Sequence, residues 1–133
     1  MSTFNSIEEA REFFKNDRFA TDNGMTIDEI GDGYARCSMD ILDCHRNAAG
    51  GVMGGVIFTL ADFAFAVSSN NAHNLTVAIS CSINYLNGPK GGRLYAYSKC
   101  IKDGRTTCVY DIDVTDDTGR AVAKFTGTGH KFV

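Results

Sequence analysis

The sequence lacks the features that mark flexible linkers and disordered tails. It contains a single proline, no low-complexity tract and no block of like charges, so no linker is indicated. With 133 residues, of which 44% are hydrophobic, the chain is long enough to build one hydrophobic core. We therefore expect one domain spanning residues 1–133.

Signals for secretion, nucleic-acid binding and nucleotide binding are missing as well. The first residues, MSTFNSIEEAREFF, carry acidic side chains early and have no apolar stretch of the secretory type. A formal net charge of −3 leaves no basic stripe, which argues against nucleic acid as a partner. Neither a P-loop nor a dinucleotide-binding glycine pattern is present.

The cysteines have the spacing of isolated thiols. Their number is odd and no CxxC pair occurs, whereas a structural zinc site requires paired short spacings. Reduced, partly buried thiols in a cytoplasmic protein explain this pattern best, and no metal site is expected. A nucleophilic Cys44 beside His45 is a weak alternative, because adjacent side chains rarely face each other. The five cysteines are Cys37, Cys44, Cys81, Cys100 and Cys108.

One apolar stretch dominates the middle of the chain. Residues 54–67, reading GGVIFTLADFAFAV, contain no proline and a single charged residue, Asp62. The length predicts a helix rather than a strand, and apolar residues on every face predict a helix buried all round. The stretch is shorter than the roughly 20 residues that a bilayer span needs, and Asp62 lies in its middle, so we expect no membrane crossing.

Asp62 requires a physical explanation. An isolated ionised carboxylate in apolar surroundings is costly, so it must be paired or neutralised. It lies too deep in the predicted helix to be an N-cap. Two interpretations stay open from the residues alone. Asp62 is either a structural acid bonded to a neighbour or a catalytic carboxylate with a shifted pKa.

The flanking segments have the alternation of strands. Ser6 followed by Glu9 predicts a capping box and a short helix that ends near Asn16. Residues 76–86 place Val77, Ile79, Cys81, Ile83 and Tyr85 on one expected face, and Gly127 with Gly129 indicates a bend or a close approach. Turn signals separate the expected strands, which are residues 25–30, 34–41, 76–86, 93–102, 106–115 and 121–132.

This order of elements predicts an α+β layer fold. An antiparallel sheet curled around one long central helix is the natural solution. A single sheet leaves part of so apolar a helix uncovered, so we expect a symmetric dimer to cover the rest.

The central motif and the order of elements resemble the hotdog-fold thioesterases, and most of all the phenylacetic-acid-degradation (PaaI-type) acyl-CoA thioesterases. The family pattern is roughly His-x-Asn-x-x-Gly-x-x-His-Gly-Gly, four residues, then Leu-Ala-Asp. The later segments SINYLNGPKGGRLYA and DDTGRAVAKFTGTGHKF are similar to a strand-and-loop segment and the last hairpin of that family. The central pattern reads here His45, Asn47, Gly50, Met53, Gly54, Gly55, Leu60, Ala61 and Asp62.

The resemblance implies a hotdog fold with residues 1–20 as a helical lead-in, assembled as a homodimer or a dimer of dimers. It implies hydrolysis of an acyl-CoA, with a small aromatic or medium-chain acyl group, to a free acid and CoA without a cofactor. Asp62 would attack the thioester or activate a water, and Gly54 would polarise the carbonyl through its amide. Asn47 would orient the water or the carbonyl. Asn47 and Gly54 would come from one subunit and Asp62 from the other.

Further residues are expected to contact the substrate. The resemblance places His45, Met53, Gly55 and Phe58 beside the acyl group, and cationic Lys90, Arg93 and Arg105 beside the CoA phosphates. Each has a structural alternative. Asn47 would form an Asx turn, His45 would bond the loop backbone, the glycines would only allow a tight turn, and the cations would be solvated surface charges.

Two residues depart from the family pattern. Met53 stands where the family usually has a histidine, and Asn87 stands where an arginine often precedes the proline-containing loop, which Gly88 lengthens. Met53 motivates an alternative function, an acyl-CoA binding or sensing protein with little catalytic activity. A hotdog dehydratase is a third hypothesis, although that chemistry typically uses a histidine with an acid and the central segment offers only His45. The acyl group and the choice between nucleophile and base stay open.

Overall fold

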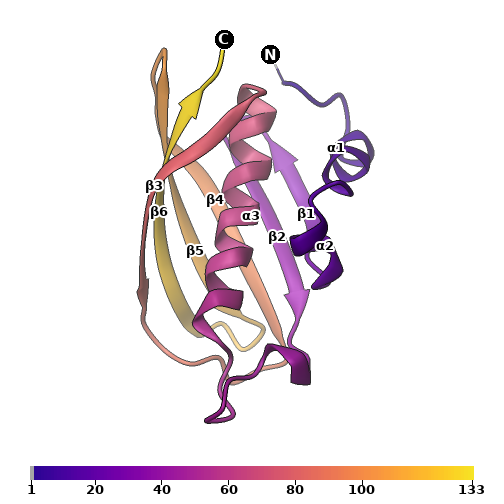
Figure 1. Ribbon diagram of the computed structural model, residues 1–133, viewed down its shortest axis with the longest axis vertical. Coiled ribbons are helices and arrows are strands. Elements are labelled where there is room, and N and C mark those ends of the chain that lie inside the picture. The colour runs from indigo at the N-terminus through magenta and orange to yellow at the C-terminus, as the bar shows by residue number, and fades with distance from the viewer. Residues whose placement is uncertain (1) are drawn as a thin grey trace.

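A six-stranded antiparallel sheet curls around one long helix, α3 (Gly54–Ala72), in the computed structural model, which describes residues 2–133 (Figure 1). The strand order is β1-β2-β4-β5-β6-β3, so β1 and β3 form the two edges. This arrangement confirms the predicted fold class, and each strand begins and ends within one residue of its predicted range. The strands are β1 (Thr26–Gly31), β2 (Tyr34–Asp40), β3 (Thr76–Tyr85), β4 (Arg93–Asp103), β5 (Thr107–Asp116) and β6 (Ala121–Lys131).

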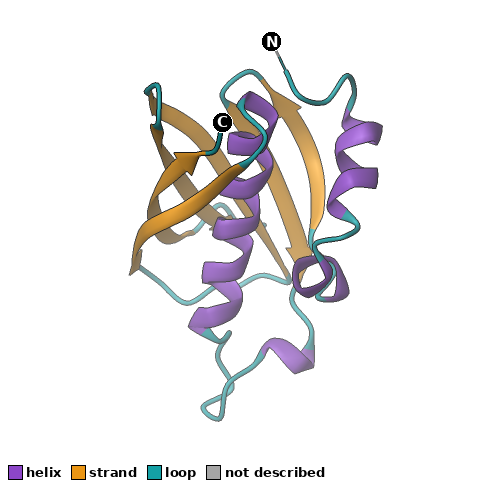
Figure 2. Ribbon diagram, turned by 45° about the horizontal axis from the view of Figure 1, so that its top comes forward, coloured by secondary structure: helices purple, strands orange, loops and turns teal. Residues whose placement is uncertain are grey.

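Two short helices precede the sheet and lie beside β1 (Figure 2). In α1 (Ile7–Phe14), Ser6 caps the helix as predicted, because its Oγ accepts from the Glu9 N–H at 3.1 Å. The capping box is only half formed, since the Glu9 carboxylate accepts from the N–H of Asn5 and not from that of Ser6. The second helix, α2 (Arg18–Asp22), was not predicted. A further short 3-10 helix, η1 (Asp43–His45), lies in the loop before α3.

Helix α3 is longer than the apolar stretch that predicts it. Residues 68–71, reading SSNN, continue it and are buried. Two of their side chains form hydrogen bonds to other segments. Asn70 Oδ1 accepts from the N–H of Thr76 at 2.8 Å, and Asn71 Oδ1 accepts from the N–H of Phe4 at 3.2 Å. The polar end of α3 therefore ties down both the start of β3 and the N-terminal segment.

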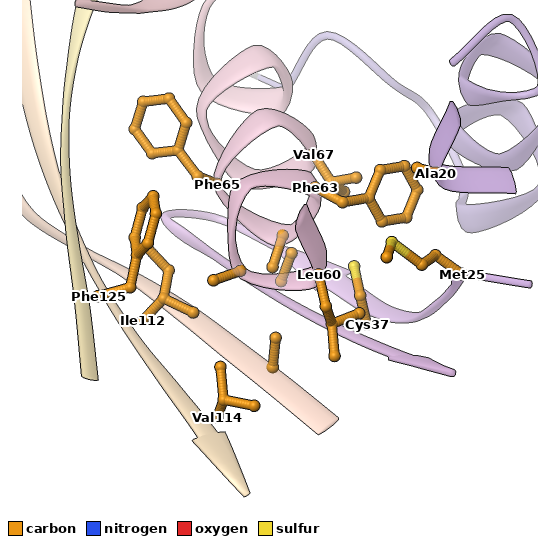
Figure 3. Packing of buried hydrophobic residues seen from close by; sticks show 14 of the residues in the cluster. Ala20, Met25, Cys37, Leu60, Phe63, Phe65, Val67, Ile112, Val114 and Phe125 are labelled. Atoms are coloured by element: carbon orange, nitrogen blue, oxygen red, sulfur yellow. The ribbon is translucent and has the colours of Figure 1, made fainter. Parts of the chain in front are cut away.

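The two faces of α3 that meet the rest of the chain use different aromatic residues. Phe65 points toward β6, where Phe125 also enters the core, while Phe63 points toward Ala20 of α2 and Met25 (Figure 3). Phe65 comes close because β6 has glycine at 127 and 129. A Cβ at Gly129 would lie 3.0 Å from the Phe65 ring, which confirms the predicted close approach.

A third stripe of α3 is not covered by the chain itself. Gly55 is exposed, and Thr59, Asp62 and Ala66, which follow it at helical spacing, are only partly buried. A single chain therefore leaves part of the helix uncovered, as the sequence analysis expects, and burial on every side stays a prediction for the dimer. One sheet layer and two short helices leave the N-terminal half of this stripe open.

Edge strand β3 departs from its predicted alternation. The register shifts between Ala78 and Ser80, so Ile79 forms a bulge that pairs with no residue of β6. As a result Thr76 is buried while Val77 and Ile79 are exposed, and only Cys81 and Ile83 pack against the core. The prediction of one continuous apolar face is wrong at the N-terminal end of β3.

Two further expectations concern the thiols and membranes. All five cysteines lie in the described part of the chain and are free, as predicted. Among residues 2–133, no helix has the length and apolar character needed to cross a membrane.

The packing around Gly129 gives a stability prediction. Gly129→Ala places a methyl group 2.8 Å from Thr76 Cγ2 and 2.9 Å from Cys108 Sγ, and overpacking of this kind costs about 1–3 kcal/mol. Gly88→Ala is the matched control, because nothing lies within 4 Å of its added Cβ. Urea unfolding should show a lower midpoint for the Gly129 variant only. Equal midpoints would show that β6 relaxes freely.

Candidate active site

The loop before α3 is built by hydrogen bonds from two of the predicted site residues. Asn47 Oδ1 accepts from the N–H groups of Ala49 at 3.0 Å and Gly51 at 3.1 Å. The Asx-type role that we considered as the structural alternative is therefore present. Its Nδ2 group has no partner within residues 2–133, so only this amide remains to orient a substrate. That role stays a prediction.

His45 is buried and fastens the same loop. Its side chain is 1% exposed, and Nδ1 accepts from the N–H of Leu42 at 3.0 Å. An accepting Nδ1 places the proton of the neutral ring on Nε2, which is buried and has no partner in the described chain. Within one chain, His45 therefore makes a structural contact and is too buried to touch a substrate.

Helix α3 begins at Gly54 with two free amides. The N–H groups of Gly54 and Gly55 make no hydrogen bond within the described residues, and Met53 caps the helix without a side-chain bond. Unsatisfied N–H groups and the positive end of the helix dipole therefore meet at this point. Such a helix start can stabilise negative charge that develops on a carbonyl oxygen.

Tyr85, at the end of β3, contacts the start of α3. Its hydroxyl donates to the Gly54 carbonyl at 3.0 Å, and a Cβ at Gly54 would lie 3.1 Å from the ring. Sequence reasoning placed Tyr85 on a strand face and did not connect it to Gly54, because 31 positions separate the two. A hollow of about 370 Å³ lies here between Val52, Gly54, Ile57, Tyr85 and the loop of residues 86–89.

Two carboxylates hold the loop of residues 88–92. Asp117 Oδ1 accepts from the N–H of Gly92 at 3.1 Å, and the other carboxylate is that of Asp116. Its Oδ2 accepts from the N–H of Lys90 at 2.7 Å and of Gly91 at 3.1 Å. Its Oδ1 accepts from the N–H and the hydroxyl of Thr118 and from the N–H of Arg120. These donors, with the Thr118 side chain first, hold the pKa of Asp116 well below the ordinary carboxyl value. Asp116 thereby fixes the loop beside the hollow under Gly54.

A second hollow, of about 420 Å³, shares Tyr85 with the first as a lining residue. Three of the four predicted acyl contacts, Met53, Gly55 and Phe58, line it, and His45 does not. The opposite wall comes from α2 and the residues after it, which were not predicted to contribute. None of the lining residues is charged, so the hollow is suited to an apolar group. The wall residues from this region are Phe19, Asn23 and Met25.

Asp62 follows the second hollow on the open stripe of α3. It has no hydrogen-bond or ion-pair partner within residues 2–133, so the structural interpretation of a bonded acid is not supported. Burial raises the pKa of the Asp62 carboxyl above its ordinary value, and the nearby charge of Asp17 raises it further. An unpaired carboxyl with a raised pKa is suited to take a proton or to attack an electrophile.

The predicted cationic contacts are dispersed. Lys90 lies in the loop that Asp116 holds, and its side chain is exposed. The guanidinium of Arg93 donates to Asp40 and Ser38, both at 2.6 Å. Because side chains alternate along a strand and that of the next residue, Leu94, faces the core, the Arg93 side chain lies on the opposite face of the sheet.

Arg105 lies at the opposite end of the sheet from Gly54. It is in the β4–β5 connection, next to Gly104, which accepts from Lys131. The chain that follows Lys131 bonds Leu75, just beyond the end of α3. Within one chain, the structure therefore does not bring Arg105 to the helix start, and its predicted contact with CoA is not supported there.

One cation near the first hollow was missed. Arg120 Nη2 donates to Asn87 Oδ1 at 3.2 Å, and Asn87 lines the hollow under Gly54. A guanidinium therefore stands beside the position where the family often has an arginine of its own. Within residues 2–133, no three histidine, cysteine or acidic side chains gather in a way that could hold a metal ion.

The profile of the thioesterase superfamily matches residues 49–123, which include Gly54 and Asp62. The chain belongs to this superfamily. It is 32% identical to the acyl-coenzyme A thioesterase PaaI of Escherichia coli over 93% of this chain and 89% of that protein. It is 34% identical to a putative esterase of Archaeoglobus fulgidus over 94% and 82% of the two chains.

Solved thioesterase structures share the fold. The E. coli PaaI protein superimposes with a TM-score of 0.89 at 31% identity, covering 95% of this chain and 92% of that one. A hypothetical thioesterase of Streptococcus pneumoniae, solved with coenzyme A, gives a TM-score of 0.82 at 31% identity over 90% and 94%. These findings confirm the resemblance to PaaI-type thioesterases and the hotdog fold.

The environment of Asp62 predicts a stability gain when its charge is removed. Because the folded-state pKa of Asp62 is raised, the ionised carboxylate destabilises the folded state once the pH exceeds its unfolded pKa, about 3.9. Asp62→Asn should raise the thermal midpoint at pH 7. The gain should shrink as the pH falls through the raised pKa and vanish below about pH 4, as measured by calorimetry. A gain of the same size at pH 3 and pH 7 would contradict this assignment.

Proposed function

We propose that this protein is an acyl-CoA thioesterase that uses Asp62 and the Gly54 amide to hydrolyse the thioester. The observation that carries the proposal is Asp62, an unpaired and partly buried carboxylate on the open stripe of α3, in a thioesterase-superfamily chain. One relative is named acyl-coenzyme A thioesterase PaaI, another acyl-coenzyme A thioesterase 13, and a similar structure was solved with coenzyme A. These names support CoA thioesters as the substrate class.

The reaction needs one group to supply an oxygen nucleophile and another to hold the oxyanion. As a base, Asp62 takes a proton from a water whose oxygen attacks the thioester carbon. As a nucleophile, its carboxylate attacks directly and forms an anhydride that water then opens. In both routes the carbonyl electron pair moves onto oxygen, where the Gly54 N–H binds it. Collapse breaks the carbon–sulfur bond, and CoA leaves as a thiolate that takes up a proton.

A second copy of the chain completes the site. Gly54 and Asp62 are eight positions apart on α3, and at about 1.5 Å per residue they are separated by about 12 Å along the axis. That distance is too long for one thioester carbonyl to contact both groups of the same helix directly. The open stripe of α3 and the exposed edge strand β3 provide the surface for a symmetric homodimer. In this dimer Gly54 acts with the partner's carboxylate, and pairing of dimers gives a tetramer.

Each of the two hollows binds a different part of the substrate. The uncharged hollow lined by Met53, Gly55 and Phe58 receives a small aromatic or medium-chain acyl group. The hollow beside residues 86–89 lies next to Lys90, whose exposed ammonium is placed to approach the CoA phosphates. Five free thiols favour a reducing, cytoplasmic location.

Turnover by the purified protein tests the proposal. Free CoA should appear when it is mixed with a panel of short, long and aromatic acyl-CoA thioesters. Asp62→Asn should lower kcat at least about 10²-fold, since a positioned acid or base contributes about 10²–10⁴. Asp32→Asn, in the exposed β1–β2 turn, is the matched control and should keep full activity. Binding of acyl-CoA without any release would instead support the sensing function, with Met53→His as the variant expected to restore turnover.

Mixed dimers test whether the site spans two copies. Gly54→Pro removes the N–H, while proline at the first helical position preserves the helix, so this variant should lose about 10²-fold or more in rate. Gly54→Ala keeps the N–H and adds a Cβ at the same place, so it should lose far less. Equal amounts of Gly54→Pro and Asp62→Asn subunits, refolded together, should recover about a quarter of wild-type activity through one intact site per mixed dimer. No recovery would mean that both groups act within one copy.

A further inference from the structure

Helix α2 lies beside the acyl hollow and carries an exposed aromatic residue, Phe19. We propose that α2 forms the outer wall of the acyl site and that Phe19 determines the size of the acyl group that is accepted. This inference rests on the proposed function and deepens it, because it assigns acyl selectivity to the N-terminal region, outside residues 49–123 that match the superfamily.

The anchoring of α2 leaves Phe19 free to face the hollow. Ala20, the next residue, is 2% exposed and lies close to Phe63 of α3 in the core (Figure 3). Phe19 itself is 70% exposed and lines the hollow together with Asn23. Asn23 Nδ2 donates to the Phe19 carbonyl at 2.9 Å, so the backbone that carries the ring is fixed while the ring has open space before it.

The hollow adjoins the start of α3. Met53 and Gly55, the two neighbours of Gly54, line it together with Phe58, and the Gly54 N–H is the group proposed to bind the carbonyl oxygen. The charge of Asp17, which precedes α2, acts on Asp62 of the same chain, so the start of α2 also lies within electrostatic reach of the open stripe. A group that enters between α2 and α3 thus has its far end near Phe19 and its near end toward the start of α3, where the partner's carboxylate acts.

The chemistry of the lining selects the acyl part of the substrate over the nucleotide part. No charged residue lines this hollow, whereas phosphates require cationic or N–H donors. Phe19, Met53 and Phe58 offer apolar surface, and each methylene that they bury strengthens binding about fourfold. Removal of the Phe19 ring opens the wall, and a larger ring at this position shortens the hollow.

Acyl-chain profiles of Phe19 variants test the inference. With saturated acyl-CoA thioesters from two to twelve carbons, Phe19→Ala should shift the preferred chain to longer acyl groups and lower kcat/KM for the wild-type optimum about five- to tenfold, while acetyl-CoA changes less than about twofold. Phe19→Trp should shift the preference to shorter chains. Ile101→Ala is the matched control, because Ile101 is also exposed, at 60%, and lies on β4 away from the hollow.

Two outcomes separate this inference from the function on which it rests. If the wild type hydrolyses no acyl-CoA, the proposed function fails. If the wild type is active but the Phe19 variants keep its chain-length profile, only the role of α2 is overturned. The same panel as acyl-pantetheine thioesters, which lack the nucleotide, should show the same shift. A shift that disappears with these substrates would place Phe19 against the CoA nucleotide and would also overturn the inference.

Discussion

The burial of α3 is the constraint on which the rest of the structure depends. A helix with so many apolar residues must be covered on several sides, and one curled sheet covers only part of it. Phe65 packs toward β6, where glycines admit its ring, and Phe63 packs toward α2. The buried polar residues at the end of α3 fix its position along the sheet. What remains open is one stripe, and that stripe carries Asp62.

The same incomplete cover sets the environment of Asp62. Enough apolar surface surrounds the carboxyl to raise its pKa, yet no donor from residues 2–133 bonds it. A fully buried position would need a partner, and a fully exposed one would leave the pKa ordinary. The folded state thus tolerates a locally unfavourable charge at the position that we propose as the proton acceptor or nucleophile.

The candidate-site residues that belong to a local sequence pattern could be proposed from the sequence, and those that depend on distant contacts could not. A lone acid in an apolar helix and a glycine pair at its start marked Asp62 and Gly54 as candidates. Tyr85 and Phe19 reach the site from elements far along the chain, so no local pattern marks them. Strand periodicity gave the sheet, but it could not place the bulge at Ile79, which depends on the pairing of β3 with β6. Within one chain Arg105 lies far from Gly54, because hairpin connections alternate between the two ends of the sheet.

The way Asp116 holds the loop beside the first hollow bears on how this enzyme can diverge. On the loop side the carboxylate bonds only backbone N–H groups, those of Lys90 and Gly91. Side chains in the loop therefore contribute little to its conformation. Substitutions of these side chains can therefore change the surface beside the proposed CoA position while the backbone of the loop is kept.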